Sequence, residues 1–403
     1  MPLIPETLAA VLSARQRNLI LLALALGGFA IGTSEFASMG LMLEISRGLH
    51  ITESQVGHLI SAYAIGVVVG APLLAFIGAR FPRRTLLLAF MTFYAVGNLG
   101  SAFGTTYGFM LVARFVAGLP HGAYFGVAML VAAAISPPAQ RGVAVSKVLL
   151  GLSISILVGN PFTTWLGQLL SWRVAFGLVS VLAVATALMI ARFLPRDPSE
   201  RLSTPMGELR AFNRTQIWLA LLIGAIGFAG MFGVFTYMAP TLVQVTGIGE
   251  AWLPLAVGAF GVGAVIGNVA GGKLVDRFRF QATAIVLAWS VVVLLLFPLA
   301  ALSPWTALPC IVAIGTMGAL AVALQTRLMD EAGEAQTLAA ASNHAAFNAA
   351  NALGPLLGGL AIDAGYGPTS TGYIGAVMAA IGLAIWYVAV HLERRNAQAV
   401  GAR

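Results

Sequence analysis

Long apolar segments alternate with short polar gaps along the whole chain, and the positive charges concentrate in every second gap. We distinguish twelve such segments, each close to the roughly 20 residues that cross a hydrocarbon core about 30 Å thick. Among the 22 Lys and Arg residues, only Arg47 and Arg173 lie in the other gaps, and Arg114 lies within a segment. Because cationic loops stay on the cytoplasmic side of a membrane, this pattern predicts twelve spans with both termini in the cytoplasm.

The composition supports an integral membrane protein. The chain is 59% hydrophobic and 9% charged, with a mean hydropathy of +0.92, whereas soluble domains carry about 25% charged residues. Its pI of about 10.1 is explained by cationic loops beside anionic lipid, so we expect the lipid bilayer and not nucleic acid as a partner. The single Cys310 excludes a disulfide framework and a cysteine metal cluster, and we expect no metal and no cofactor.

The longest polar stretch divides the chain into two halves. We expect a first six-helix bundle in residues 1–194, a cytoplasmic linker in 195–215 and a second six-helix bundle in 216–403. The predicted spans begin near Leu19, Gln55, Arg84, Tyr107, Gly142 and Arg173, and then near Gln216, Trp252, Ala282, Trp305, Gln336 and Thr369.

The two halves repeat each other in two places. The second span ends in Gly78-Ala-Arg-Phe-Pro-Arg-Arg84 and the eighth in Gly272-Lys-Leu-Val-Asp-Arg-Phe278. The fifth and eleventh spans both carry a Gly-Pro pattern, at Gly159 and Pro161 and at Gly354 and Pro355. The fold class is therefore all-α, with twelve transmembrane helices in two pseudo-symmetric bundles. Such repeats place a substrate site near the midplane and expose it alternately to either side, which is the architecture of a transporter.

These motifs resemble those of the major facilitator superfamily over the whole chain. The loop after the second span is similar to the superfamily's G-x-x-x-D-R-x-G-R-R motif, with Ala75, Ala79 and Pro82 in place of its first Gly, its Asp and its second Gly. The resemblance implies a gating latch that closes the halves in the outward-open state, and its residues would be Arg80, Arg83, Arg84, Gly272, Asp276 and Arg277. Because Ala79 replaces the Asp, we expect Asp276 and Arg277 to form the stronger part of the latch.

A narrower resemblance is to the twelve-helix drug:proton antiporters, in the branch of sugar, purine-nucleoside and chloramphenicol exporters. It is carried by Gly32-Thr-Ser-Glu-Phe-Ala-Ser-Met-Gly40, Pro120-His-Gly122, Leu324-Gln-Thr-Arg-Leu-Met-Asp330 and Asn343-His-Ala-Ala-Phe-Asn348. It implies a proton-coupled exporter of a small organic molecule in a bacterial inner membrane, and we expect a functional monomer. A proton-coupled importer of a sugar or metabolite remains an alternative, as does a ligand-binding membrane sensor, although no polar segment is long enough for a signalling domain.

Three ionisable residues lie deep inside the predicted spans. Glu35 is about 16 residues into the first span, where a carboxylate is costly unless it faces water or takes up a proton. It is either a proton carrier or a structural carboxylate. Arg114 lies at a similar depth and can meet Glu35; it either biases the charge of that carboxyl or ties helix ends together. His121 shares one helical face with Gly118 and Arg114, and it is a candidate proton relay or a packed hydrogen-bonding residue.

Other polar and aromatic residues are candidate substrate contacts. His344, Asn348 and Asn351 recur on one face of the eleventh span, which indicates either a wet cavity or a packed helix. The remaining candidates are Tyr63, Tyr124, Phe232, Tyr237 and Gln325. The Gly-Pro pairs at Gly159 and Pro161 and at Gly354 and Pro355 predict either a moving seam between helices or ordinary close packing.

Enzymatic motifs are missing from the sequence. Gly267-Asn-Val-Ala-Gly-Gly-Lys-Leu274 approaches a phosphate-binding loop, but Leu274 replaces the metal-binding hydroxyl and the stretch closes a membrane span. The five histidines show no H-E-x-x-H spacing, and no G-x-S-x-G elbow is present. We therefore expect a transporter that is not an enzyme.

Overall fold

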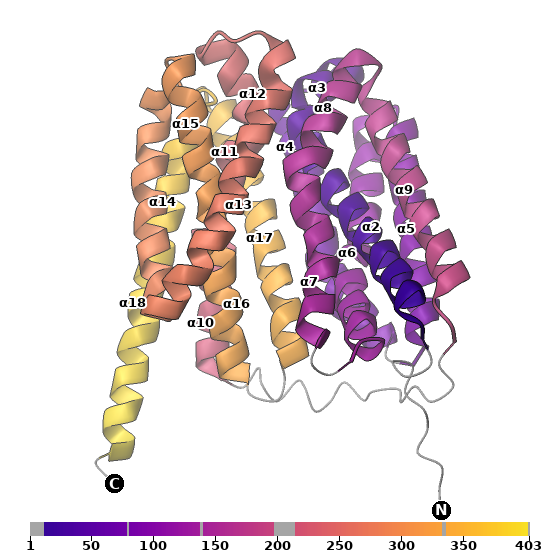
Figure 1. Cartoon of the computed structure of the whole chain (residues 1–403). Helices are drawn as coiled ribbons and strands as arrows, with labels where there is room; N and C mark the ends of the chain where they lie inside the picture. The colour runs from indigo at the N-terminus through magenta and orange to yellow at the C-terminus, as the bar shows by residue number, and fades with distance from the viewer. Residues whose placement is uncertain (1–11, 79, 138–139, 197–213, 333–335, 402–403) are drawn as a thin grey trace, which may run out of the picture.

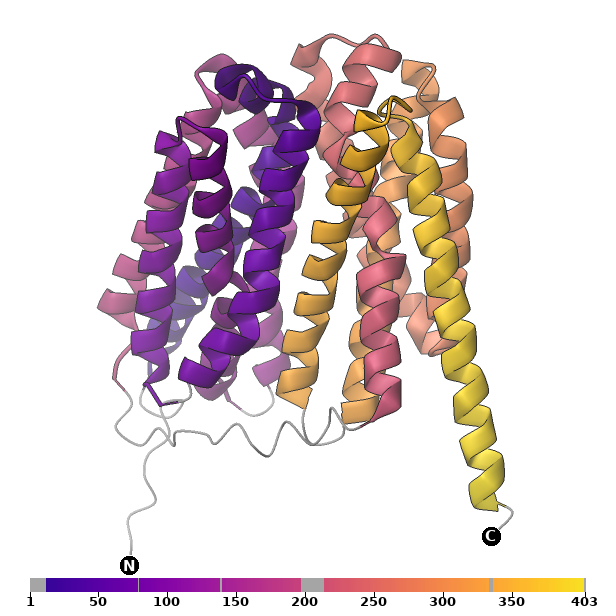
Figure 2. The same ribbon diagram turned by 180° about the vertical axis from the view of Figure 1, so that it is seen from behind.

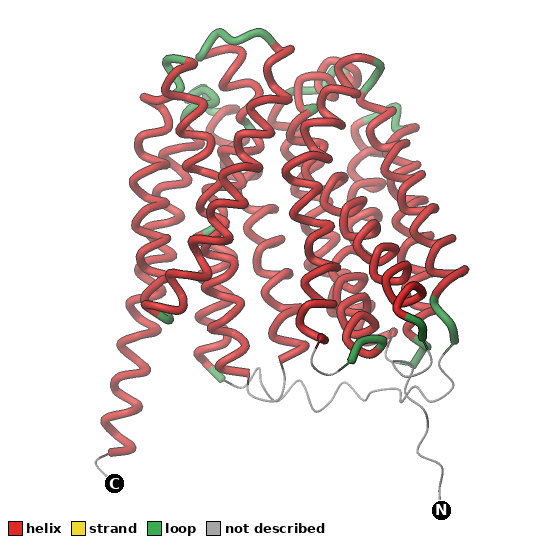
Figure 3. Tube along the Cα trace, in the orientation of Figure 1, coloured by secondary structure: helices red, strands yellow, loops and turns green. Residues whose placement is uncertain are grey.

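All regular secondary structure in the part of the chain that the structure describes is helical (Figure 3). The structure is a computed structural model that describes residues 12–78, 80–137, 140–196, 214–332 and 336–401. Twelve of its helices are long and apolar enough to cross a membrane. The predicted fold class and the number of spans are confirmed.

The first six spans run from Ala14 to Phe193. They are α2 (Ala14–Gly40), α4 (Glu53–Gly78), α5 (Arg83–Phe103), α6 (Tyr107–Ala134), the fifth span from α7 (Arg141–Ile154) through the π-helix η2 (Ser155–Gly159) to α8 (Asn160–Leu169), and α9 (Trp172–Phe193). A short helix, α3 (Met42–Leu49), joins α2 to α4.

The last six spans run from Thr215 to the end of α18. They are α10 (Thr215–Gly227) with α11 (Ala229–Thr236), then α13 (Leu253–Phe278), α14 (Gln281–Ala300), α15 (Pro304–Gly315) with the turn η6 (Thr316–Gly318) and α16 (Ala319–Ala332), α17 (Gln336–Asp363) and α18 (Ser370–Gly401). Between α11 and α13 lie α12 (Met238–Pro240), η4 (Thr241–Val245) and η5 (Glu250–Trp252). Most of the predicted linker lies outside the described residues.

Two groups of six spans stand side by side and nearly parallel (Figures 1 and 2). The start of α2 and the end of α18 lie at the same end of the bundle, which we call the terminal end; the opposite end is the distal end. Between the groups, α4 packs on α17, and η2 and α8 pack on α13. These are the largest contacts between the first and the second half, and smaller ones join α6 to α17 and α2 to α11.

Small residues let the spans approach closely. A Cβ atom on Gly118 of α6 would lie 2.1 Å from the Tyr63 carbonyl oxygen of α4, and one on Gly66 of α4 would lie 2.2 Å from the Phe115 carbonyl oxygen. Glycines on both helices therefore place α4 and α6 in backbone contact. Outward-facing residues such as Val181 and Leu188 of α9 are large, apolar and exposed, as expected for side chains that contact lipid.

Candidate functional site

The central carboxyl group belongs to Glu35 of α2. The residue is 6% exposed, and Asn351 Nδ2 of α17 donates a hydrogen bond to Glu35 Oε1 over 3.1 Å. The two residues lie in opposite halves, so this bond crosses the interface near the middle of the bundle. Asn351 Oδ1 has no hydrogen-bond partner among the described residues and remains available as an acceptor.

Arg114 of α6 is fully buried beside this carboxyl. Its Nη1 donates to Ser34 Oγ and its Nη2 to the Ser34 carbonyl oxygen, both over 3.1 Å. Its guanidinium also lies over the Tyr63 ring, 4.3 Å from the centroid. Arg114 and Glu35 therefore lie at similar depths, as predicted, but the direct partner of the guanidinium is Ser34, the neighbour of Glu35 in sequence.

A hydrogen-bonded chain extends from this cluster through the first half. Ser34 Oγ donates to Asn98 Oδ1 of α5 over 2.5 Å. The hydroxyls of Tyr63 and Tyr94 lie 3.1 Å apart, and the Tyr63 hydroxyl lies 3.0 Å from His121 Nδ1. The prediction that Arg114, Gly118 and His121 share one face is confirmed, because all three contact Tyr63.

The polar face of α17 is directed toward the first half. The His344 ring stacks on Phe125 of α6, with centroids 5.6 Å apart and an interplanar angle of 2°. Asn348 Nδ2 donates to the His344 carbonyl oxygen over 3.0 Å, so it is tied to its own helix. Gln325 Oε1 accepts a hydrogen bond from Asn343 Nδ2 over 2.8 Å, between α16 and α17.

The aromatic candidates separate into two kinds. Phe232 of α11 stacks on Phe36 of α2, with centroids 6.4 Å apart, and therefore lies at the interface between the halves. The hydroxyls of Tyr124 and Tyr237 donate to the carbonyl oxygens of Leu24 and Pro355, over 2.8 and 2.9 Å. Both bonds stay within one half, so these hydroxyls already serve helix packing.

The Gly-Pro pairs lie at helix contacts of different kinds. A Cβ on Gly159 would lie 2.5 Å from Thr33 Oγ1 of α2, whereas Pro161 faces Gly258 of α13, whose Cβ would lie 3.6 Å from the Pro161 ring. Gly159 therefore contacts the first half, to which it belongs, whereas Pro161 contacts the second half. A Cβ on Gly354 would lie 2.3 Å from the Ala229 carbonyl oxygen, a contact within the second half.

The predicted latch residues lie at the terminal end. Arg84 Nε and Nη2 donate to the Leu194 and Ala191 carbonyl oxygens, both over 2.7 Å, so this side chain binds within the first half. Arg80 is exposed and Arg83 is partly buried, whereas Ala79 lies outside the described residues.

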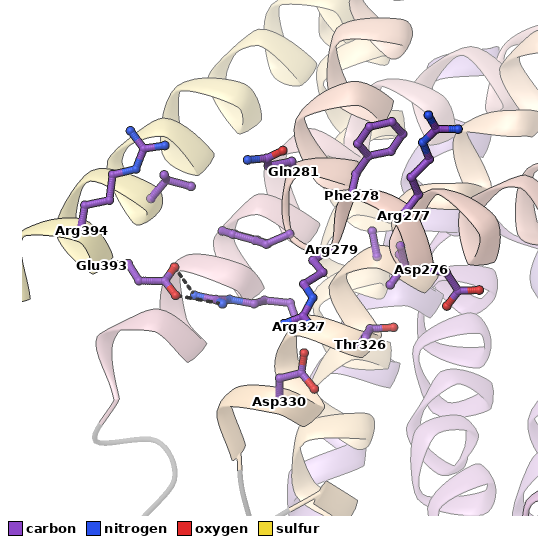
Figure 4. A pocket seen from close by; sticks show the side chains of 14 residues that line it. Asp276, Arg277, Phe278, Arg279, Gln281, Thr326, Arg327, Asp330, Glu393 and Arg394 are labelled. Carbon is purple, nitrogen blue, oxygen red and sulfur yellow. Dashed lines mark hydrogen bonds and ion pairs between the residues drawn. The ribbon is translucent and has the colours of Figure 1, made fainter. Parts of the chain in front are cut away.

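Asp276 and Arg277 line a cavity of about 850 Å³ within the second half, and Gly272 precedes them on α13 (Figure 4). On its other side, Arg327 Nη2 binds Glu393 Oε2 over 2.8 Å and Glu331 Oε1 over 2.9 Å. Asp276 and Arg277 point away from this ion pair. Positive and negative side chains both line the cavity, and the ion pairs of Arg327 with Glu331 and Glu393 stay within the second half.

The distal end carries bonds that sequence reasoning missed. Arg47 of α3 forms a two-pronged ion pair with Glu250 of η5, with Nη1 to Oε1 at 3.2 Å and Nη2 to Oε2 at 2.7 Å. Gln244 Nε2 donates to Glu53 Oε1 over 2.7 Å. The only sequence signal was that Arg47 interrupts the alternation of charge. These bonds join the two halves, so the structure is closed at the distal end.

Comparisons with known proteins agree with this architecture. The family profile described as Major Facilitator Superfamily matches residues 24–343. The inner membrane transport protein YdhP of Escherichia coli K12 is 35% identical over 93% of this chain and 97% of its own. The chloramphenicol resistance protein of Streptomyces lividans is 33% identical over 83% and 86%.

A solved structure shares the fold. The bacterial homologue of the human lysosomal transporter Spinster, in an inward-facing and occupied conformation, aligns with a TM-score of 0.75 and 16% identity over 94% of this chain and 98% of that one.

Proposed function

Because the chain belongs to the major facilitator superfamily and is a transporter of that family, we propose that it exports a small organic molecule in exchange for protons. Its relatives support export, since one is named a chloramphenicol resistance protein and another a probable sugar efflux transporter. We propose a drug, sugar or nucleoside as the class of substrate.

The observation that carries the proposal is the bond between Glu35 and Asn351. A buried carboxyl exists either as a charged acceptor or as a neutral acid, and the interior of a membrane favours the neutral acid. Since its partner lies in the other half, the charge of Glu35 is linked to the contact between the halves. A proton taken up at this point therefore changes the interface that alternating access must open and close.

Arg114 and His121 have supporting roles in this proposal. A guanidinium does not release its proton under physiological conditions, so Arg114 supplies a fixed positive charge next to Glu35, held by Ser34. His121 is held by the Tyr63 hydroxyl and is the candidate relay in the first half. Phe232, His344 and Asn351 are proposed to contact substrate, because each faces the opposite half.

The charge pattern supports an orientation. The terminal end carries Arg80, Arg84, Arg277 and Arg394, so we propose that it faces the cytoplasm. In this orientation the distal end faces the periplasm of a bacterial inner membrane. We propose that closure of that end corresponds to an inward-facing state and that the protein functions as a monomer.

Inside-out membrane vesicles test the proposal. The interior of vesicles that contain the protein is acidified, and uptake of radiolabelled nucleosides, pentoses and amphenicol drugs is measured. The expected result is accumulation of one class, abolished when an ionophore dissipates the pH gradient and missing from vesicles without the protein. Uptake only into right-side-out vesicles with an acidic exterior would instead identify an importer and overturn the proposal of export.

A further inference from the structure

A second carboxyl group at the interface between the halves lies outside the membrane spans. Glu44 is on α3, beside Arg47, and faces Glu250 of the second half. Gln168 of α8 completes the group by donating to the Glu250 carbonyl oxygen over 2.9 Å. We call these four residues the distal gate. They line a cavity of about 420 Å³ between the halves.

Two carboxylates share one guanidinium in this gate. Glu250 takes both prongs of Arg47, whereas Glu44 Oε1 lies 3.7 Å from Arg47 Nη2, beyond hydrogen-bonding distance. The Glu44 side chain is 11% exposed, and neither of its carboxylate oxygens has a hydrogen-bond partner among the described residues. Glu44 is thus a buried acid whose nearest cation binds another carboxylate more closely.

We infer that Glu44 is a second protonation site of the transporter and that proton uptake there stabilises the closed distal gate. The charged groups that face it are Arg47 on its own helix and Glu250 on η5. When Glu44 is neutral, Arg47 binds Glu250 without a competing carboxylate, and no unpaired charge is buried between the halves.

The direction of the pH effect follows from burial. Burial raises the pKa of Glu44 and is the largest effect; the backbone of Glu44 itself, Arg47 and the Gln168 side chain lower the pKa, and the Glu250 carboxylate raises it. When the halves separate, Glu44 regains water and its pKa falls back toward its ordinary value. The closed gate therefore binds the proton more tightly than the open gate. Low pH favours closure, and this contribution is lost as the pH rises through the pKa of the closed state.

The inference rests on the proposed alternating access and on the periplasmic position of the distal end. A proton from the acidic periplasm then has two effects. It drives transport, and when it binds Glu44 it also stabilises the closed distal gate. For a single proton, the ratio of closed to open gate changes by at most about tenfold per pH unit.

The test measures gate closure directly in the full-length protein. Cys310 is replaced by Ala, and spin labels are placed at Thr105→Cys and Leu302→Cys, exposed positions at the distal ends of the two halves. Distances between the labels are then recorded in lipid nanodiscs at pH values from 5 to 8. We expect the short-distance population to grow as the pH falls.

Variants at Glu44 decide the assignment. Glu44→Gln is expected to remove the pH dependence and to leave the gate mainly closed, because the amide is neutral at every pH. Glu44→Asp should restore a pH dependence, whereas the control Asp330→Asn, an acid of α16 at the terminal end that lines a cavity within the second half, should retain the wild-type midpoint. A wild-type pH profile in Glu44→Gln would overturn the inference. If the distance between the labels stayed the same at every pH and in every variant, including Arg47→Ala, the proposed alternating access would be overturned as well.

Discussion

The two ends of the bundle place their charges in opposite ways. At the distal end, Arg47 and Glu53 bind Glu250 and Gln244 of the other half. At the terminal end, Arg84 and Arg327 bind partners within their own halves. Bonds that cross the interface must break when the halves separate, whereas bonds within a half persist through the cycle. We infer that distal charges set the balance between conformations and that the terminal charges of Arg84 and Arg327 hold each half together.

The largest expected effect lies between the two ends, at Glu35. Glu35→Gln keeps the oxygen that accepts from Asn351 but cannot exchange a proton, so the interface should form while its link to protons is lost. We expect transport driven by a pH gradient to fall to background, while counterflow, which needs no net proton movement, survives. Purified protein in proteoliposomes allows both measurements.

Retention of full gradient-driven transport by Glu35→Gln would make the carboxylate structural. Coupling would then have to be sought at His121 or His344. The matched control is Glu53→Gln, which neutralises another carboxyl group that bonds across the two halves, at the distal end. Transport by this variant should still be driven by the pH gradient.

Each half can move as a unit only if its helices are packed tightly, and the contact of Gly118 in α6 with α4 is part of that packing. In Gly118→Ala, the new Cβ would lie 2.1 Å from the Tyr63 carbonyl oxygen, so α4 and α6 must separate. We expect a loss of about 1–3 kcal/mol in the free energy of unfolding, measured as a lower melting temperature in detergent. Gly126→Ala on the same helix meets nothing within 4 Å and should melt like the wild type; equal losses in both variants would refute the packing argument.

The ion pairs of the two ends can be compared directly by matched substitutions. Arg47→Ala removes a bond between the halves and Arg84→Ala removes bonds within one half. Because the Arg47 side chain is 60% exposed, its ion pair is worth about 1 kcal/mol at most. We therefore expect Arg47→Ala to lower the ratio of closed to open distal gate by up to about fivefold, as measured with the label pair at Thr105 and Leu302.

Arg84→Ala should leave that ratio unchanged at the same pH and in the same lipid. An equal shift in both variants would remove the distinction between the two ends.

Much of the fold is predictable from the sequence, because a helix must be long and apolar to cross the hydrocarbon core and because cationic loops stay on the cytoplasmic side. The predicted starts at Tyr107 and Gln336 coincide with those of α6 and α17. Helical periodicity also placed Arg114, Gly118 and His121 on one face correctly.

Contacts between helices were harder to predict, because depth in a membrane follows from residue count but rotation about a helix axis does not. Counting placed Arg114 level with Glu35, yet the guanidinium binds Ser34. The chain through Tyr63, Tyr94 and Asn98 depends on the rotation of two helices, α4 and α5. The pair of Arg47 and Glu250 joins residues 203 positions apart, and no local pattern connects them.

The smallest expected effect concerns Asp276, which is exposed at the terminal end. If Arg80 and Arg83 close this end against the second half in the opposite conformation, Asp276 would provide a negative charge for them. An exposed ion pair contributes about 1 kcal/mol or less, so Asp276→Asn should slow cycling measurably, by up to about fivefold. The measurement is the initial rate of substrate exchange in proteoliposomes at matched protein density. Asp330→Asn, an acid that lines the same cavity from α16, should exchange at the wild-type rate. Equal rates for Asp276→Asn and the wild type would leave the terminal end without a charge-based latch, and closure there would then depend on apolar packing alone.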